Sequence, residues 1–287
     1  MPAPLLVVDA PFVLYRSYYA LPESITGIDG RPVGGLLGAT NVILRLLADR
    51  RPRATVICFG AEAATYRTAL YAGYHAARPP VPEPLAWQFE QAPALWQAFG
   101  WICVDSDEVE ADDFLGSFAT AEAGAGGSTL ILTGDRDMYQ CADSQTTILY
   151  LKGPGVEEVD RDEVVARYGI EPAQVPDFIA LRGDPSDSLP GAPGIGAKTA
   201  AELLVRHGSL EGVLAGASSE KPRIGASLTE NAEMLRAYRE IALLRSVEVE
   251  LPADEETDLA GGAMAAGALG IGALSRRLAK AQSLADL

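Results

Sequence analysis

Short apolar runs, one of them ending in an acid, constrain the fold of this chain most. Residues 5–9 read LLVVD, and similar runs cover 54–59, 101–104 and 129–132. Runs of this length are typical of strands buried on both faces. Helical spacing of apolar residues predicts helices over 36–49, 86–99 and 112–121. Strands that alternate with helices predict an α/β fold with a mostly parallel central sheet flanked by helices.

The alternating pattern ends near residue 175 and divides the chain. We expect an α/β core over 1–175 and a helical region over 176–287, in which Gly/Pro turns join the helices. Residues 64–85 interrupt the core with tyrosines, arginines and a Pro-rich exit, which indicates an excursion over the sheet edge. The tail after residue 251 is rich in Ala and Gly and is expected to be helical near 274–281.

Composition narrows the class of protein. Apolar residues make up 48% of the 287, which indicates a globular chain with a buried core. No run of about 20 apolar residues occurs, so we expect no membrane span, and the first residues do not resemble a secretory signal. Cys58, Cys103 and Cys141 are widely spaced, so we expect free thiols in a reducing cytoplasm.

Eight acidic residues stand at chemically suggestive places. They follow strands, begin a helix or lie in a Gly-rich loop, and they are Asp9, Glu110, Asp112, Asp113, Asp135, Asp137, Asp184 and Asp187. Each has an ordinary explanation: acids in a first helical turn complement the helix dipole, and Asp is common in turns. The first six, however, are expected at one edge of the same sheet, where their charges would repel without a counter-ion. A hard cation with oxygen ligands, Mg²⁺ or Mn²⁺, resolves this, and two such ions are the usual means of phosphoryl displacement by water.

The net charge of −16 argues at first against a nucleic-acid partner. Without the eight acids of the expected metal site the charge is −16 + 8 = −8. The chain is still acidic, so a contact with DNA has to be local and assisted by metal.

Four blocks of sequence resemble the bacterial 5′-nuclease family, which includes the N-terminal domain of DNA polymerase I, stand-alone flap endonucleases and phage 5′-exonucleases. They are LLVVDAPFVLYRSYYALP, EVEADDFLG, LTGDRDMYQ and LRGDPSDSLPGAPGIGAKTAAELL, and they occur in the family's order. The resemblance implies a PIN-like nuclease core with the eight acids as ligands of two metal ions. It implies two further elements, a helical arch over about 64–85 and a helix–three-turn–helix motif that grips duplex DNA.

The resemblance also assigns roles outside the acids. In the arch it implies catalytic roles for Arg67, His75 and Arg78, with His75 at the position of a lysine near the scissile phosphate, and contacts with DNA for Tyr71 and Tyr74. In the helix–three-turn–helix motif it places the DNA-binding residues Gly194, Ile195, Gly196, Lys198 and Thr199, with K⁺ as a further expected ion. Backbone N–H groups at such a turn approach phosphate closely. Aromatic packing and an ordinary helix start are the alternatives for these two segments.

Two positions depart from the family pattern. Gly60 stands where the family has an aspartate that binds the first metal, and His75 replaces an arch lysine. Restoring the carboxylate at 60 is expected to tighten the first metal, provided that the backbone there is not at positive φ.

The leading hypothesis is a metal-dependent 5′-flap endonuclease and 5′-3′ exonuclease of replication or repair. Its substrates would be DNA with a 5′ flap, a nick or a 5′ single-stranded end, and we expect a monomer in the bacterial cytoplasm at the nucleoid. Gly60 and His75 favour a second reading, a weakly active or non-catalytic paralogue that binds branched DNA. A small-RNA nuclease on the related fold is the third hypothesis, and the block from Asp184 to Ala201 argues against it.

Overall fold

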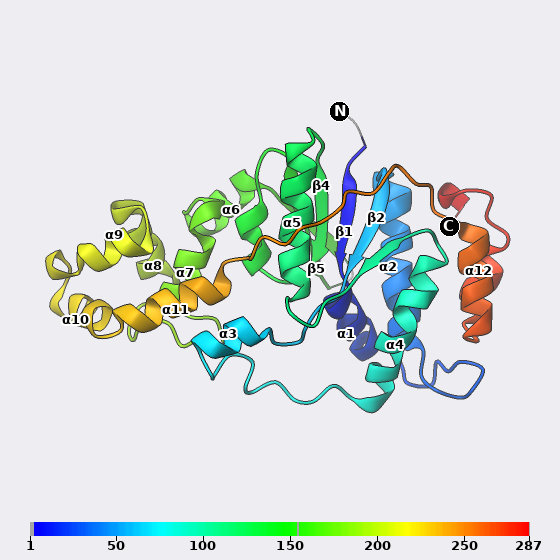
Figure 1. Cartoon of the computed structure of the whole chain (residues 1–287), viewed down its shortest axis with the longest axis horizontal. Coiled ribbons are helices and arrows are strands. Elements are labelled where there is room, and N and C mark those ends of the chain that lie inside the picture. Colours follow the sequence, from blue (N-terminus) through cyan, green and yellow to red (C-terminus); the bar gives the residue numbers. More distant parts are fainter. Residues whose placement is uncertain (1–2, 154, 287) are drawn as a thin grey trace.

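The computed structural model describes residues 3–153 and 155–286 of the chain. A six-stranded sheet forms its centre, with the order β3-β2-β1-β4-β5-β6 (Figure 1). The strands are β1 (Leu5–Asp9), β2 (Ala54–Cys58), β3 (Ile102–Val104), β4 (Thr129–Thr133), β5 (Thr146–Lys152) and β6 (Gly155–Val159). The helices around the sheet are α1 (Ala10–Ala20), α2 (Gly34–Arg50), α3 (Thr65–Leu70), α4 (Glu83–Gln97), α5 (Ala111–Gly124) and α6 (Arg161–Tyr168). The helices that follow in the chain are α7 (Val175–Arg182), α8 (Ala197–His207), α9 (Leu210–Ala215), α10 (Pro222–Glu230), α11 (Ala232–Ala242), α12 (Leu259–Ala268) and α13 (Gly272–Leu278).

The sheet is parallel except at one edge. β1 pairs with β2 on one side and with β4 on the other, and only β6 runs antiparallel, against β5. The chain winds outward from β1 to β3 and then returns to the far side of β1 with β4. This reversal makes a topological switch point between the carboxyl ends of β1 and β4, where ligands bind in open α/β sheets.

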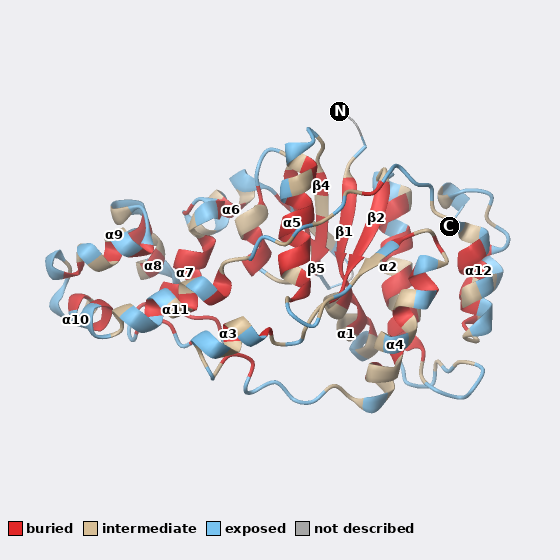
Figure 2. Cartoon of the chain, viewed as in Figure 1, coloured by how far each residue is buried: buried red, intermediate tan, exposed pale blue. Residues whose placement is uncertain are grey.

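Alternate side chains of each strand enter two separate cores. Leu5 and Val7 of β1 face the layer that contains α5, while Leu6 and Val8 face the layer of α1, α2 and α4. All four are completely buried, as Figure 2 shows for the central strands. Burial on both faces explains why these strands are uninterrupted apolar runs.

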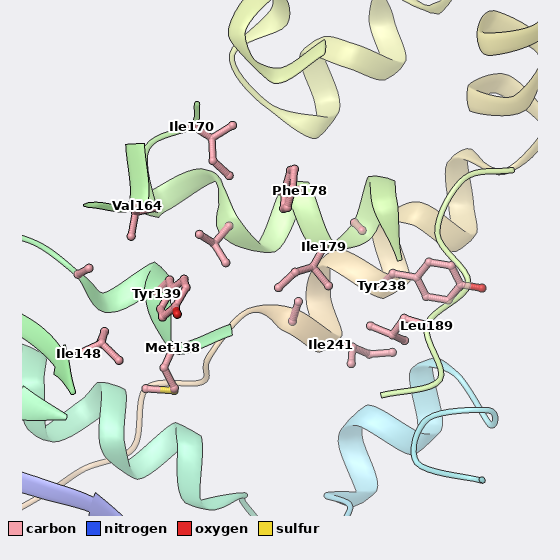
Figure 3. Packing of buried hydrophobic residues seen from close by; sticks show 14 of the residues in the cluster. Met138, Tyr139, Ile148, Val164, Ile170, Phe178, Ile179, Leu189, Tyr238 and Ile241 are labelled. Carbon is pink, nitrogen blue, oxygen red and sulfur yellow. The ribbon is translucent and has the colours of Figure 1, made fainter. Parts of the chain in front are cut away.

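The helical region is continuous with the first of these cores. Figure 3 shows Met138 and Ile148 beside the sheet in one packed cluster with Phe178, Ile179 and Ile241 of α7 and α11. This shared apolar surface fixes α7–α11 against the sheet, so that loops from both parts meet at one place.

After α11 the chain returns across the sheet. Residues 243–258, which we call the C-terminal strap, run over α5 and lead to α12 and α13 at the opposite end of the molecule (Figure 1). Ala266, Leu274 and Leu278 of these helices belong to the core of α1, α2 and α4. Within the expected helical region over 176–287, α7–α11 pack together beside the sheet, and the C-terminal helical segment packs on the sheet layer.

Most expected elements occur, with shifted ends. The predicted strands become β1 to β4, and the predicted helices become α2, α4 and α5. β5 and β6 were not expected. The arch segment, residues 64–85, contains α3 and the first turn of α4, and turns and irregular chain between them. Among the described residues, no helix is long and apolar enough to cross a membrane.

Candidate active site

Asp9 and Thr133 end the two strands that flank the switch point. Asp9 caps α1 by accepting a hydrogen bond from the Phe12 N–H at 2.9 Å, and its other oxygen accepts from the Thr133 hydroxyl at 2.7 Å. Burial raises the pKa of Asp9, although these two hydrogen bonds act in the opposite direction. Thr133 was not predicted as a site residue. It stands directly before the Gly-Asp of the third block, and this position next to an expected metal ligand was the signal that could have identified it.

Three more carboxylates share this edge of the sheet. Burial raises the pKa of Asp135 to about 7, and the charge of Asp187 adds to the effect. For Asp112 and Asp137 burial is again the largest cause, followed by the charge of Asp135, and both pKa values lie well above the ordinary one. We call Asp9, Asp112, Asp135 and Asp137 the acid cluster. Its members lie close enough to disfavour one another's ionised forms, and they are four of the six acids that the sequence predicted at this edge.

Glu110 and Asp113 have protein partners instead. Asp113 is fully buried and accepts hydrogen bonds from Arg67 Nη2 at 2.9 Å, the Tyr66 hydroxyl at 2.8 Å and the Arg245 N–H at 2.9 Å. Glu110 accepts from the Tyr74 hydroxyl and from the Ala64 N–H, both at 2.8 Å. These contacts join the base of the arch segment to α5 and to the C-terminal strap.

Arg67 is the centre of this arrangement. Its side chain is 3% exposed, and its Nη1 lies 2.8 Å from Glu110 Oε2 without the alignment of a hydrogen bond. Nε donates to the Ile241 carbonyl at 3.0 Å. Burial disfavours the charged guanidinium, but the two carboxylates outweigh it and raise the pKa of Arg67. The structure therefore gives Arg67 a bridging position between acids rather than an open one facing a substrate.

Asp184 and Asp187 are presented by a tight loop after α7. The loop closes through two backbone hydrogen bonds between Asp184 and Leu189, both 2.8 Å long. Gly183 and Gly191 face each other across it at positive φ, and a methyl group on Gly191 would lie 2.3 Å from the Gly183 nitrogen. Only glycine permits that approach. Asp184 accepts from Arg182 at 3.0 Å and from the Ser186 N–H at 2.8 Å.

His75 and Arg78 connect the arch segment to Asp187. His75 Nε2 lies 3.1 Å from Asp187 Oδ1, and Arg78 Nη2 lies 3.2 Å from the same oxygen. The imidazole is buried and stacks on Tyr74 at 3.8 Å between ring centroids. These two predicted arch residues therefore meet the acids of the loop after α7, with Arg78 the more exposed of the two.

The two predicted DNA-contacting tyrosines pack within the protein. Tyr74 is 5% exposed, and Tyr71 packs edge-on against Tyr238 of α11 with centroids 5.2 Å apart. Both rings thus follow the packing alternative that the sequence left open.

Gly60 lies against the start of α5. Its φ is outside the left-handed region, yet a Cβ there would lie 2.6 Å from the Ala111 nitrogen and 2.7 Å from the Val109 oxygen. Contacts this short with backbone require the chain to move. An aspartate at position 60 would therefore collide with the backbone at the start of α5, although the φ angle of Gly60 itself would accept a side chain.

The predicted DNA-binding turn is open. Gly194, Gly196 and Lys198 are exposed and Thr199 is partly so, whereas Ile195 is buried beneath them. The first N–H group of α8 that has a backbone acceptor is that of Ala200, which donates to the Gly196 carbonyl at 2.9 Å. The earlier N–H groups of the helix have no partner within it, which is the property that lets a helix N-terminus bind phosphate.

The donors suit a hard divalent cation. Within residues 3–153 and 155–286, no group of three or more His, Cys, Asp or Glu side chains is arranged as a ready-made metal site. The acid cluster nevertheless supplies oxygen ligands alone, and the burial and mutual repulsion that raise the pKa values of these carboxylates favour a cation among them. The charges of the loop acids act on this cluster, and both acids also have protein partners: Asp187 Oδ1 contacts His75 and Arg78, and Asp184 Oδ2 contacts Arg182.

Comparison with known proteins agrees with this arrangement along most of the chain. The family model described as 5′-3′ exonuclease, N-terminal resolvase-like domain, matches residues 4–169, and the one described as 5′-3′ exonuclease, C-terminal SAM fold, matches 170–261. A 5′-3′ exonuclease of Streptomyces coelicolor is 35% identical over 284 residues, which cover 92% of this chain and 93% of that protein. DNA polymerase I of Mycobacterium leprae is 34% identical over 253 residues, which cover 84% of this chain and 28% of the polymerase. The chain thus spans little more than a quarter of its polymerase relatives.

Solved structures share the fold at lower identity. The bacteriophage T5 flap endonuclease, in a complex with DNA and metal ions, matches with a TM-score of 0.70 and 14% identity over 99% of this chain and 100% of its own. The T5 5′-exonuclease with bound zinc matches with a TM-score of 0.68 and 16% identity, over 96% and 98% of the two chains. The catalytic core of Rad2 with a DNA substrate gives 0.65 and 16%, over 97% and 92%.

Proposed function

Because this chain belongs to the 5′-3′ exonuclease family, we propose that it hydrolyses DNA phosphodiesters at 5′ flaps and 5′ ends as a metal-dependent structure-specific nuclease. One observation carries the proposal beyond family membership. The acid cluster stands at the switch point of the sheet with pKa values raised by burial and mutual repulsion. Such a site gains stability from divalent cations, and a 5′ nuclease uses them.

Asp9, Asp112, Asp135 and Asp137 would hold the metal, with Asp184 and Asp187 beside them. Two bound Mg²⁺ or Mn²⁺ ions supply an activated water and a stabilised leaving oxygen for in-line displacement at phosphorus. The protein's own part is to hold the acids in place. Thr133 fixes Asp9 by its hydroxyl, and the backbone of Asp137 donates to Asp135 Oδ1 at 2.9 Å.

Other residues would position the DNA. Arg78 is the more open cation beside the acids and suits a contact with a substrate phosphate, whereas His75 orients Asp187. The exposed turn at 194–196 with Lys198 would hold duplex phosphate away from the cut, with K⁺ as a further expected ion there. The T5 flap endonuclease and the Rad2 catalytic core, which share this fold, were solved in complexes with DNA, which supports DNA as the partner.

A weakly active paralogue that binds branched DNA is the second candidate. Gly60 favours it, because the backbone of the Val109–Ala111 segment occupies the space that a carboxylate side chain would need. Asp9 and Asp112 would then hold the first metal with one charged ligand fewer. A monomer acting in the bacterial cytoplasm at the nucleoid stays a prediction for either candidate.

Cleavage of a labelled 5′-flap duplex tests both. Purified protein with Mg²⁺ or Mn²⁺ should release the flap as a short product, and chelation should stop the reaction. A protein that binds the flap but leaves it intact at every metal concentration would support the paralogue instead. An uncut and unbound flap would remove both candidates.

A further inference from the structure

Cations in the helical region differ in whether they have acidic partners. Arginines of α7, α8 and α11 are paired: Arg182 with Asp184, Arg206 with Glu220, Arg236 with Glu211 and Glu233, and Arg239 with Asp177. For Lys198, Lys221 and Arg223, the described part of the chain offers no ion pair and no side-chain hydrogen bond. Because no acid of the described residues pairs with them, these three cations are available to an anionic partner.

Arg223 stands against the predicted DNA-binding turn. A Cβ on Gly194 would lie 3.5 Å from Arg223 Nε and 3.6 Å from its Nη2, so the guanidinium lies next to the turn's backbone. α10 is tied to the same turn, because the Ser227 hydroxyl donates to the Pro193 carbonyl at 2.8 Å. This bond holds Arg223 beside Gly194 although 29 residues separate them in sequence.

The position of Arg223 extends the turn into a two-sided cationic surface. Lys198 stands after the turn, in the first turn of α8, and Arg223 covers Gly194 from α10. Both are exposed, as is Lys221 at the start of α10. Because an acidic protein repels a polyanion elsewhere, phosphates of a duplex are favoured where unpaired cations gather.

We propose that Arg223 is a DNA-binding residue that contacts a duplex phosphate beside the one held by Lys198 and the Gly194–Gly196 turn. This inference rests on the proposed function, since it takes duplex DNA as the partner. Arg223 supplies a planar fork that pairs with phosphate oxygens, whereas Lys198 supplies a point charge. The turn is then gripped from two helices.

Equilibrium binding of a fluorescent 5′-flap duplex, measured without divalent metal so that nothing is cut, tests the proposal. Arg223→Ala should weaken binding about fivefold at low salt, the upper range for one exposed charge contact. It should also make the slope of log affinity against log salt shallower by about 0.9, as one lost phosphate contact predicts. Arg223→Lys should keep the slope, because it keeps the charge.

Arg236→Ala is the matched control. Arg236 is another exposed arginine of the helical region, but its charge is already met by Glu211 and Glu233, so the slope should stay that of the unchanged protein. Thermal unfolding of each variant separates a binding effect from a folding effect. If Arg223→Ala has the same salt slope as Arg236→Ala while Lys198→Ala binds the duplex more weakly, Arg223 does not contact DNA, and the proposed function still stands. A wild-type chain that neither binds nor cuts the flap overturns the proposed function with it.

Discussion

His75 Nε2 lies 3.1 Å from Asp187 Oδ1 while the opposite ring nitrogen, Nδ1, lies 2.8 Å from the Glu62 carbonyl. A carbonyl oxygen only accepts, so Nδ1 carries a proton. Nε2 and Asp187 must then share another proton, on one side or the other, for their contact to be a hydrogen bond. The backbone of His75 is held at φ 54°, an uncommon conformation that the surrounding contacts have to maintain.

The first prediction concerns this pair. Replacing His75 with Gln or Asp187 with Asn should each destabilise the fold, and the double variant should lose less than the sum. We expect a coupling of about 0.5–3 kcal/mol, the range for contacting residues. Denaturant unfolding of the four proteins measures it. Additive losses would mean that the two side chains do not interact in solution.

The second prediction concerns the acid cluster. Asp135→Ala or Asp137→Ala should reduce flap cleavage at least ~100-fold, because a ligand of the proposed metal site is lost. Both variants should fold, since removing a like charge relieves repulsion. Asp107→Asn, an exposed acid outside the cluster, is the control for charge alone. Near wild-type cleavage by either alanine variant would show that the metal lies elsewhere.

The third prediction is a pH dependence without metal. Burial raises the pKa of Asp135 to about 7, above the value of about 3.9 for aspartate in an unfolded chain. Between these values the folded state binds more protons than the unfolded state, so the free energy of unfolding should fall as pH rises from about 4 to 7. The stability from this group is present below that window and lost above it.

Unfolding in chelator across this pH range checks the sign. Asp135→Asn should flatten the dependence relative to wild type, whereas Asp107→Asn should leave it unchanged. Mg²⁺ should raise the unfolding midpoint more at pH 8 than at pH 5, because protons compete with the metal at low pH. An Asp135→Asn profile parallel to that of wild type would contradict the assigned pKa.

The fourth prediction concerns Gly60. Gly60→Asp should destabilise the protein by about 1–3 kcal/mol, the usual cost of overpacking, and should not lower the metal concentration for half-maximal cleavage. Gly60→Ala is the matched variant and should lose a similar amount, since its Cβ meets the same backbone atoms of Val109 and Ala111. A stable Gly60→Asp protein with a lower metal requirement would refute the steric account.

The fifth prediction concerns an ion pair under the C-terminal strap. Arg53 donates to Glu122 through Nε at 2.9 Å and Nη2 at 2.6 Å, and its Nη1 reaches the Pro252 carbonyl at 2.6 Å. Glu122 is 3% exposed, so Arg53→Ala should cost about 3–5 kcal/mol by leaving a buried charge unpaired. Arg161→Ala, which breaks the exposed pair with Glu171, should cost less than about 1 kcal/mol. Equal losses in the two variants would count against a buried pair.

The central strands were predictable because burial on both faces leaves a continuous apolar run. β1 was predicted with its observed ends, and β2 and β4 to within one residue. β6 was missed because it lies at the sheet edge, where polar residues such as Glu157 and Glu158 replace apolar ones. β5 was missed although Ile148, Leu149 and Leu151 are buried, because its apolar run is short and begins and ends with polar residues. An antiparallel edge strand is set by its neighbour as much as by its own sequence.

The site was predictable only in part for a similar reason. Asp9 and Asp135 follow strands, so their meeting at one edge could be read from the sequence. Arg67 gave no such signal, because its contacts with Asp113 and Ile241 join segments 46 and 174 residues apart. The packing of Tyr74 and the lack of space at Gly60 are likewise long-range properties that a local pattern does not contain.

The return of the strap to the sheet layer sets an order on folding during synthesis. α12 and α13 complete the core of α1, α2 and α4, so that core stays open to solvent until residues 259–278 have left the ribosome. The helices α7–α11 are translated before α12 and α13, and their apolar residues share one core cluster with residues of the sheet. We therefore expect the finished chain to unfold as one cooperative unit, with no stage at which its first half stands alone.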